Sequence, residues 1–362
     1  MLVNLDDIKK IAIGSLFLGG GGGGDIREGL AAAKRALELG EVQIVPLSEI
    51  RKKDGVILTI SGVGSPASDT AYYSEDVYER ILKLIQSQEK REIIGLIPCE
   101  MGGSSSFEPF IPAARLNIPV INSACDGRAH PFGIMGSLGL EKSGNNITIQ
   151  AGAGGKEETN TYVEILLTGS IETTSDLIRN AAAKAGGAVA VARNPVSPFW
   201  IENAGATGAY DLAYKIGEAY LKGKTVMDKI TAVCSVVGGT VICRGRVENY
   251  ILNTENALDH GSFTVCSEND KYKLYFFNEY MAVEKNKDRL HTFPDLITTI
   301  DWETGEILTT AQIKNGCNII VVAAPKEKML LGKGLMYRDV YERIEKILEI
   351  EMQKYVNEIF LD

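Results

Sequence analysis

Residues 11–27 read IAIGSLFLGGGGGGDIR, an apolar run followed by six glycines and an aspartate. We interpret the apolar run, Ile11 to Leu18, as a strand. Glycine adds backbone entropy cost to the interior of a helix or strand and brings no side chain to pack, so Gly19 to Gly24 are expected to form a loop. A helix-like pattern then extends to Gly40, with Asp25 as its N-cap.

The glycine loop suits close approach of a ligand to bare backbone. The free N–H groups and the positive dipole end of the following helix point into it. The alternative is a tight strand-to-helix turn without a ligand. No Lys-Ser/Thr pair follows the last glycine, so the run is not a P-loop. It fits the spacing G-x-G-x-x-G, as any glycine run does, but no acidic residue stands at the Rossmann spacing. The substrate-binding residues expected here are Gly20, Gly21, Gly22, Gly23 and Asp25.

Composition narrows the class of protein. The net charge of the 362 residues is −9 and basic residues do not cluster, which argues against nucleic-acid binding. No apolar stretch reaches 18 residues, so no membrane span is expected. The six cysteines lack a C-x-x-C pair and the three histidines lie far apart, which favours reduced thiols in the cytoplasm and predicts neither a metal nor a cofactor. A small-molecule substrate and a homo-oligomer fit this composition.

The first half of the chain alternates strand and helix patterns. We expect strands at 55–61, 93–98, 119–121, 147–151 and 163–167, and helices between them such as 72–90 and 111–116. This alternation predicts an α/β domain over residues 1–226: a three-layer α/β/α arrangement with a mostly parallel sheet. Ligands of such sheets collect at the carboxyl ends of the strands, so the loops at 19–25, 62–69, 99–107 and 122–131 are expected to share one cleft.

The second half changes character. Residues 230–324 read as short strands, beginning with ITAVCSVV at 230–237 and separated by regular turn signals. This spacing predicts a smaller all-β, barrel-like domain over residues 227–328. Residues 334–360 read as one amphipathic helix, and the segment 329–362 is expected to pack on the first domain through its apolar stripe.

Several polar residues follow predicted strands. Glu100 could act as a general base or cap a helix, with Gly102, Gly103 and Ser104 beside it leaving room for a ligand. His130 could act as an acid or base, or be a packed or surface residue. Arg128 could hold a substrate carboxylate or pair with Asp126, which is a further catalytic candidate.

Two other positions stay open. Cys125 could be a nucleophile if a base lowers its pKa, or an inert buried thiol. Asn278 and Glu279 interrupt an apolar strand and are both candidates for substrate binding, although adjacent side chains point to opposite faces of a strand and only one can face a cleft.

The motifs together carry a resemblance. LFLGGGGGGD (16–25), PCEMGGSSSFEP (98–109), GRAHP (127–131), FFNEYMAVE (276–284) and FPDLITTIDWETGEILTTAQIKNGCNIIVVAAP (293–325) occur in this order. The chain thereby resembles the S-methyl-thiohydantoin desulfurase-like family, which was long of unknown function and is associated with hydantoinase and oxoprolinase genes. The resemblance implies an α/β domain, a β-barrel domain and a cytoplasmic enzyme acting on a hydantoin-like five-membered ring.

Three positions depart from the family pattern. Asn122, Ala124 and Phe132 stand where the resemblance implies acidic residues. Two hypotheses follow. The chain is a hydrolase or desulfurase of a hydantoin- or thiohydantoin-like cyclic amide, with Glu100 as its principal acid–base group. Alternatively it is a catalytically inactive ligand-binding protein, or a partner of a hydantoinase, that retains the fold.

Overall fold

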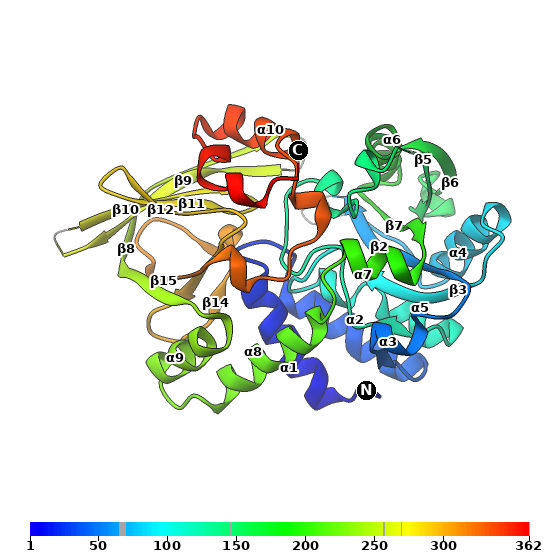
Figure 1. The fold of residues 1–362 in the computed structure, drawn as a ribbon, viewed down its shortest axis with the longest axis horizontal. Helices are drawn as coiled ribbons and strands as arrows, with labels where there is room; N and C mark the ends of the chain where they lie inside the picture. Colours follow the sequence, from blue (N-terminus) through cyan, green and yellow to red (C-terminus); the bar gives the residue numbers. More distant parts are fainter. Residues whose placement is uncertain (65–69, 145–146, 256–257, 269, 362) are drawn as a thin grey trace.

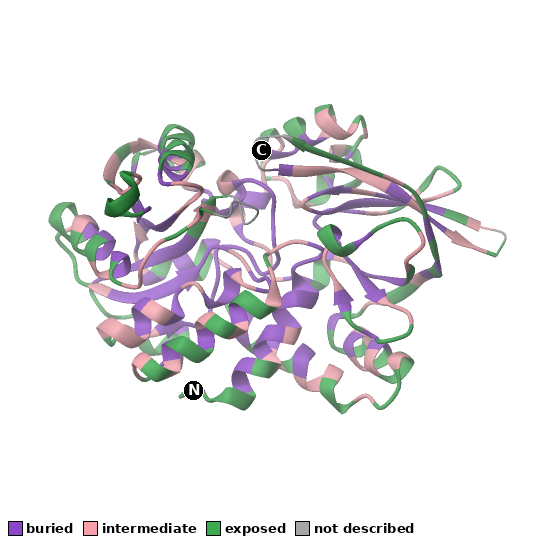
Figure 2. Cartoon of the chain, turned by 180° about the vertical axis from the view of Figure 1, so that it is seen from behind, coloured by how far each residue is buried: buried purple, intermediate pink, exposed green. Residues whose placement is uncertain are grey.

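The chain folds into two sheets, with most of its helices packed around the first (Figure 1). The computed structural model describes residues 1–64, 70–144, 147–255, 258–268 and 270–361. The predicted loop at 62–69 therefore lies largely outside the described residues. The middle strands of the first sheet are mostly buried, whereas the outward faces of the helices and much of residues 240–254 in the second sheet are exposed (Figure 2).

The first sheet has seven strands in the order β1-β4-β3-β2-β7-β5-β6. The neighbours from β1 to β2 pair in parallel, and those from β2 to β6 pair antiparallel, so the mostly parallel sheet predicted from the sequence is wrong. The connection from β5 to β6 is too short for a helical crossover and gives an antiparallel pair. The strands are β1 (Ile44–Val45), β2 (Val56–Gly64), β3 (Ile93–Pro98), β4 (Val120–Ile121), β5 (Ile147–Gly154), β6 (Val163–Ser170) and β7 (Ala188–Val196).

Helices lie on both sides of β7. Ala190 and Ala192 share a buried cluster with Ile81 of α4, whereas Val191 shares another with Ile178 of α6. Alternate residues of a strand point to opposite faces, so α4 and α6 cover opposite faces. The helices are α1 (Leu5–Leu18), α2 (Ile26–Leu39), α3 (Leu47–Ile50), α4 (Val77–Gln88), α5 (Phe110–Leu116), α6 (Ile171–Lys184), α7 (Pro198–Ala204), α8 (Ala209–Lys222), α9 (Val226–Val237) and α10 (Asp339–Leu348).

The apolar run before the glycines is the second half of helix α1, which corrects the predicted strand. A capping box between Asn4 and Asp7 starts the helix upstream of the run. Helix α8 packs so closely on α1 that a Cβ on Gly14 would overlap the backbone of Ala213. A short apolar run fits a buried strand and a buried helix equally, so only the upstream cap distinguishes them.

The second sheet has eight antiparallel strands in the order β12-β11-β10-β9-β8-β15-β13-β14. It curls around a core of its own, and the Tyr280 hydroxyl of β11 lies 2.9 Å from the Thr299 hydroxyl of β13. Among the described residues the edge strands β12 and β14 do not pair, so the sheet is curled but open. The strands are β8 (Thr240–Glu255), β9 (Leu258–Ser267), β10 (Asp270–Phe277), β11 (Glu279–Lys285), β12 (Asp288–Thr292), β13 (Leu296–Asp301), β14 (Ile307–Leu308) and β15 (Asn318–Ala324).

Two further elements differ from the sequence prediction. The segment 230–237 belongs to helix α9, which a capping box of Thr225 and Asp228 starts, and is not a strand. The predicted helix over 334–360 is the shorter α10, because Glu349 adopts a left-handed φ of 54° and two 3-10 turns follow.

Helix α10 closes over the junction of the two sheets. Its Tyr341 and Ile344 share a buried cluster with Phe132, from the loop after β4, and with Phe277 and Phe293 from the second sheet. The domain limits at residues 226 and 328 stay a prediction. No helix in the described ranges combines the length and apolar character that crossing a bilayer requires.

Candidate functional site

Three loops meet where α1 ends and strands β3 and β4 end. The carbonyl of Gly23 accepts hydrogen bonds from the backbone N–H groups of Ser104 (3.0 Å) and Ser105 (3.2 Å). A Cβ on Gly23 would lie 2.5 Å from the Gly102 Cα and 3.2 Å from the Ala129 Cβ. The structure thus brings the glycine loop, the loop after Glu100 and the GRA loop into contact.

Glycine is required at the centre of this junction. Gly23 has a φ of +75°, which favours glycine, and any side chain there would strike Gly102. A Cβ on Gly22 would overlap the Glu279 carboxylate. Gly22 and Gly23 are half-buried and Gly24 is exposed, so solvent reaches the loop from this side.

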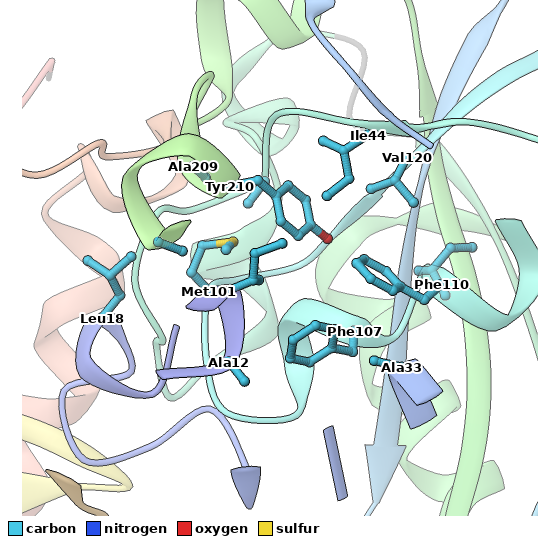
Figure 3. Packing of buried hydrophobic residues seen from close by; sticks show 14 of the residues in the cluster. Ala12, Leu18, Ala33, Ile44, Met101, Phe107, Phe110, Val120, Ala209 and Tyr210 are labelled. Carbon is cyan, nitrogen blue, oxygen red and sulfur yellow. The ribbon is translucent and has the colours of Figure 1, made fainter. Parts of the chain in front are cut away.

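The loop after β3 is anchored by apolar and aromatic packing. Met101, Phe107 and Phe110 are fully buried around Tyr210 of α8 (Figure 3). The Tyr210 hydroxyl donates a 2.6 Å hydrogen bond to the Ser106 carbonyl. This core fixes the backbone on both sides of residues 102–105.

Glu100 and His130 form the most tightly coupled polar pair of the junction. The Glu100 Oε2 accepts from the His130 backbone N–H (3.0 Å) and lies 2.6 Å from the His130 Nδ1. The His130 side chain is 2% exposed and the Glu100 side chain 16%. Burial opposes a charge on His130, but the Glu100 carboxylate and the Cys99 thiol outweigh it and raise the pKa of His130 to about 10.

Cys99 completes the surroundings of His130. Its Sγ lies 3.9 Å from the His130 Nε2, and Gly136 packs against both groups. The neighbouring Cys125 Sγ lies 3.1 Å from the Thr59 hydroxyl. The hydrogen bond to Cys125 and burial raise the pKa of Cys99. Burial also acts against charge on Cys125, but hydrogen bonds from Cys99 and Thr59 lower its pKa overall.

Arg128 ties the GRA loop to the second sheet. It is fully buried, its Nη1 donates to the carbonyls of Pro294 (3.1 Å) and Asp295, and its guanidinium carbon lies 4.3 Å from the Phe293 ring centre. Burial lowers the pKa of Arg128. Its Nη2 has no hydrogen-bond partner among the described residues and faces Gly20. Arg128 is therefore chiefly structural, with one donor left toward the glycine loop.

Two buried carboxyl groups flank Arg128. Asp126 accepts from the Gly332 N–H (3.1 Å) through Oδ1, whereas Asp126 Oδ2 and Glu279 Oε2 have no partner in the described part of the chain. Burial raises the pKa of Asp126 to about 7 and that of Glu279 well above its usual range. Buried polar atoms are normally satisfied. The three orphaned atoms of Asp126, Arg128 and Glu279 therefore mark where a polar ligand or water would bind.

Two side chains predicted to bind substrate make hydrogen bonds within the fold instead. The side-chain Oδ1 of Asn278 accepts from the Asp259 N–H (2.9 Å), which holds a turn in the second sheet, and Glu279 alone faces the glycine loop. Asp25 caps α2 by accepting from the Arg27 N–H (2.7 Å), as the sequence predicts. A binding role for either residue has no contact to support it.

The remaining predicted residues lie along the glycine loop. Gly103 packs against the Gly24 carbonyl and the start of α2, and Ser104 lies against Gly24. Gly21 accepts from the Thr310 N–H (2.8 Å), and Gly20 accepts from the Tyr280 N–H (2.8 Å). The loop therefore bridges the first and second sheets.

Sequence reasoning missed two polar groups. Cys99 precedes Glu100 at the same strand end, a position that signals the site as clearly as Glu100 does. Arg193 interrupts the buried strand pattern AVAVARNPV of β7, and a charged residue within such a run is unusual. Across the described ranges, no group of three or more His, Cys, Asp or Glu side chains is arranged to hold a metal ion.

Two family models and one solved structure are similar to this chain. A family model described as the S-Me-THD-like N-terminal domain matches residues 6–163, and the corresponding C-terminal domain model matches residues 170–336. The fold is similar to the crystal structure of a protein from Chromobacterium violaceum, with a TM-score of 0.69, 17% sequence identity and 96% of each chain covered. A search of curated proteins gave no significant match.

Proposed function

The chain belongs to the S-Me-THD-like family, and we propose that it hydrolyses a hydantoin- or thiohydantoin-like cyclic amide. The observation that carries this proposal is the Glu100–His130 pair, held at 2.6 Å beside the glycine loop. The His130 contacts fix the orientation of a partly exposed carboxylate, which is a kind of group that serves as a general base.

The two residues take different parts. Glu100 Oε2 is occupied by two donors of His130, so Glu100 Oε1 is the oxygen available to a water molecule. With a pKa of about 10, His130 is an imidazolium at neutral pH and holds the carboxylate in place by charge and hydrogen bonding. Glu100 is thus the catalytic base, and His130 is its positioning residue.

The proposed step is attack of water on a ring carbon. Glu100 takes one proton from the water as its oxygen bonds to the carbon that carries the S-methyl group. The nitrogen of the ring C=N bond takes up the second proton of the water, the C–S bond breaks, and Glu100 passes its proton to the departing sulfur, giving methanethiol and a cyclic amide. In an unsubstituted hydantoin the same attack would break the ring C–N bond.

The glycine loop supports binding of the ring. Gly22, Gly23 and Gly24 expose backbone without side chains at the solvent side of the junction. The buried Nη2 of Arg128 and the Oε2 of Glu279 offer a donor and an acceptor without partners in the described chain. A five-membered cyclic amide carries alternating N–H and C=O groups that match such a pair.

One observation favours an inactive ligand-binding protein as the second candidate. Asn122, Ala124 and Phe132 serve packing: the Asn122 Oδ1 accepts from the Tyr210 N–H (3.1 Å) at the start of α8, Ala124 is buried, and Phe132 stacks near Phe277. A member that lost acidic groups at these positions would bind the ring without turning it over.

A substrate panel tests the proposal. Purified protein is incubated with hydantoins and S-methyl thiohydantoins, and both thiol release and ring opening are measured. Turnover by the wild type that Glu100→Gln abolishes supports the hydrolase. Thermal stabilisation by these compounds without turnover, in a correctly folded protein, supports the second candidate instead.

The cellular setting follows from the thiols. All six cysteines are free, although Cys99 and Cys125 lie side by side. Free thiols persist in a reducing compartment. We infer a cytoplasmic location, with a small molecule as the partner and a homo-oligomer as the assembly to test.

A further inference from the structure

Arg193 is a buried cation without a counter-ion. It is 7% exposed, and its Nη2 donates a 2.7 Å hydrogen bond to the Ser61 hydroxyl. Its Nε has no hydrogen-bond partner among the described residues, where the only side chain that accepts a hydrogen bond from the guanidinium is the neutral hydroxyl of Ser61. A buried charge that lacks a partner is costly, so its retention calls for an anion that is absent from the free protein.

The guanidinium lies near the short turn that packs against His130 and Cys99. Its Nη1 is 3.6 Å from the position that a Cβ on Gly133 would occupy, and Gly136 of the same short turn packs against His130 and Cys99. The positive charge of Arg193 acts on Cys99. Gly133 and Glu100 are both half-buried, so this side of Arg193 is the one nearest to solvent.

A nearby carboxylate does not neutralise Arg193. Glu108 accepts a 2.7 Å hydrogen bond from the Gly62 N–H rather than from the guanidinium. Burial raises the pKa of Glu108 well above its usual range, which favours its neutral form. Glu108 therefore does not pair with Arg193, and the positive charge of Arg193 can still attract an anion.

Two further arginines lie toward the same face. Arg193 lies on the same face of β7 as Val189 and Val191, which pack on α6. Helix α6 also carries the exposed Arg179. Although Arg179 is exposed as a residue, neighbouring side chains remove part of the solvent around its guanidinium and lower its pKa, and the charges of Arg343 and Arg193 add to this effect. Arg343 projects from α10, with its guanidinium carbon 4.6 Å from the Phe132 ring centre. Figure 1 shows α6 and α10 on the same side of the molecule.

We propose that Arg193 binds a carboxylate of the substrate, and that Arg179 and Arg343 attract this anion from solvent. The substrate class is then a five-membered cyclic amide that carries a carboxylate on a short side chain. A single planar guanidinium matches a carboxylate in a two-point hydrogen bond, which a tetrahedral free anion uses less completely. This inference rests on the proposed function, because it takes the ring to lie at Glu100.

Isothermal titration with two matched compounds tests the site. Hydantoin-5-acetate carries the carboxylate, and hydantoin-5-acetamide has nearly the same shape without the charge. We expect the wild type to bind the acetate about 10- to 100-fold more tightly, the scale of a charged hydrogen-bonded contact. Arg193→Gln should abolish this preference, whereas Arg246→Gln, which removes an exposed arginine of β8, should keep it.

The outcomes separate the two proposals. Equal binding of acetate and acetamide by a wild type that turns over the ring overturns the carboxylate site and leaves the reaction standing. An Arg193-dependent preference without turnover of any compound removes the reaction and retains the site. Inorganic phosphate that displaces the acetate with equal affinity would reassign the site to a free anion and overturn the proposal.

Two more variants protect the test against misfolding. Arg193→Lys keeps the charge but loses the planar fork, and it should lower the preference about tenfold. Arg179→Gln combined with Arg343→Gln changes only exposed side chains and should slow association of the acetate several-fold and weaken its salt dependence. An unchanged association rate in this double variant would contradict the attraction role.

Discussion

The chain contains two histidine–carboxylate pairs of nearly equal geometry. His130 Nδ1 lies 2.6 Å from Glu100 Oε2, and His291 Nδ1 lies 2.7 Å from Asp295 Oδ2. The difference lies in what surrounds them. Asp295 uses its other oxygen to accept from the Lys326 N–H (2.9 Å), whereas no residue in the described part of the chain donates a hydrogen bond to Glu100 Oε1. The same chemical pair is thus a clamp in one place and a candidate base in the other.

The comparison shows that a short contact does not identify a catalytic pair. The second pair joins the turn after β12 to the segment after β15, and it stabilises a connection within the second domain. The first pair lies where three loops from separate parts of the chain meet, and one of its carboxylate oxygens accepts no hydrogen bond from the described residues. The feature that separates the two pairs is therefore Glu100 Oε1 and its neighbours, rather than the hydrogen bond to the histidine.

The largest expected effect is on turnover. Glu100→Gln keeps the shape and removes the charge, so kcat should fall about a hundredfold or more, the scale of a lost general base. Asp295→Asn, the matched change in the other pair, should leave kcat within a few-fold of the wild type. Steady-state kinetics of both variants check this. Equal losses in the two variants would erase the distinction between the pairs.

The next effect is the pH dependence of stability. The pKa of folded His130, about 10, lies above its ordinary value near 6.5, so this pair contributes fully below pH 6.5 and its contribution is lost as the pH rises through 10. The free energy of unfolding should fall by up to about 1.4 kcal/mol per pH unit above pH 7.

Chemical denaturation between pH 7 and 8.5 measures this fall. The pKa of Asp126 is also raised, to about 7. The stability that Asp126 contributes is therefore lost as the pH rises toward 7, mostly before this window begins. His130→Gln should reduce the fall, whereas Asp295→Asn should retain it in full. The buried carboxyl groups of Glu108 and Glu279, whose pKa burial raises well above the usual range, act in the same direction and account for any fall that remains. A wild type with flat stability across the window would show that His130 is not charged in the folded protein.

A smaller effect concerns the clamp. Asp295→Asn leaves the His291 ring without a carboxylate partner, and we expect a loss of about 1–3 kcal/mol in unfolding free energy. Urea denaturation at pH 7 gives the value. A variant as stable as the wild type would mean that the His291–Asp295 pair does not stabilise the fold, and the structural role given to it here would be wrong.

The smallest effect belongs to a carboxylate outside both pairs. Asp25 caps α2 at the end of the glycine loop, so Asp25→Ala should cost about 1 kcal/mol of stability and leave KM unchanged. Denaturation and kinetics on the same preparation check both parts. A large rise in KM with little loss of stability would restore Asp25 as a binding residue.

The sequence indicated much of the site because strand ends and glycines are visible in it. Glu100 follows a clear buried strand, and the glycine run meets it as expected. The helix before the glycines was missed because a short apolar run has no distinguishing period. The antiparallel half of the first sheet was missed because pairing direction depends on which strands become neighbours. Arg193 was overlooked because its significance depends on a missing partner, which only the folded structure shows.

The most direct test of the account is a crystal structure of the protein with a hydantoin bound. We predict that a ring carbon lies about 3–3.5 Å from a water held by Glu100 Oε1, with the His130 contact to Oε2 retained. The ring should rest against Gly22 to Gly24. A ring bound elsewhere, for instance beside His291 and Asp295, or one that displaces Glu100 from His130, would contradict the central claim.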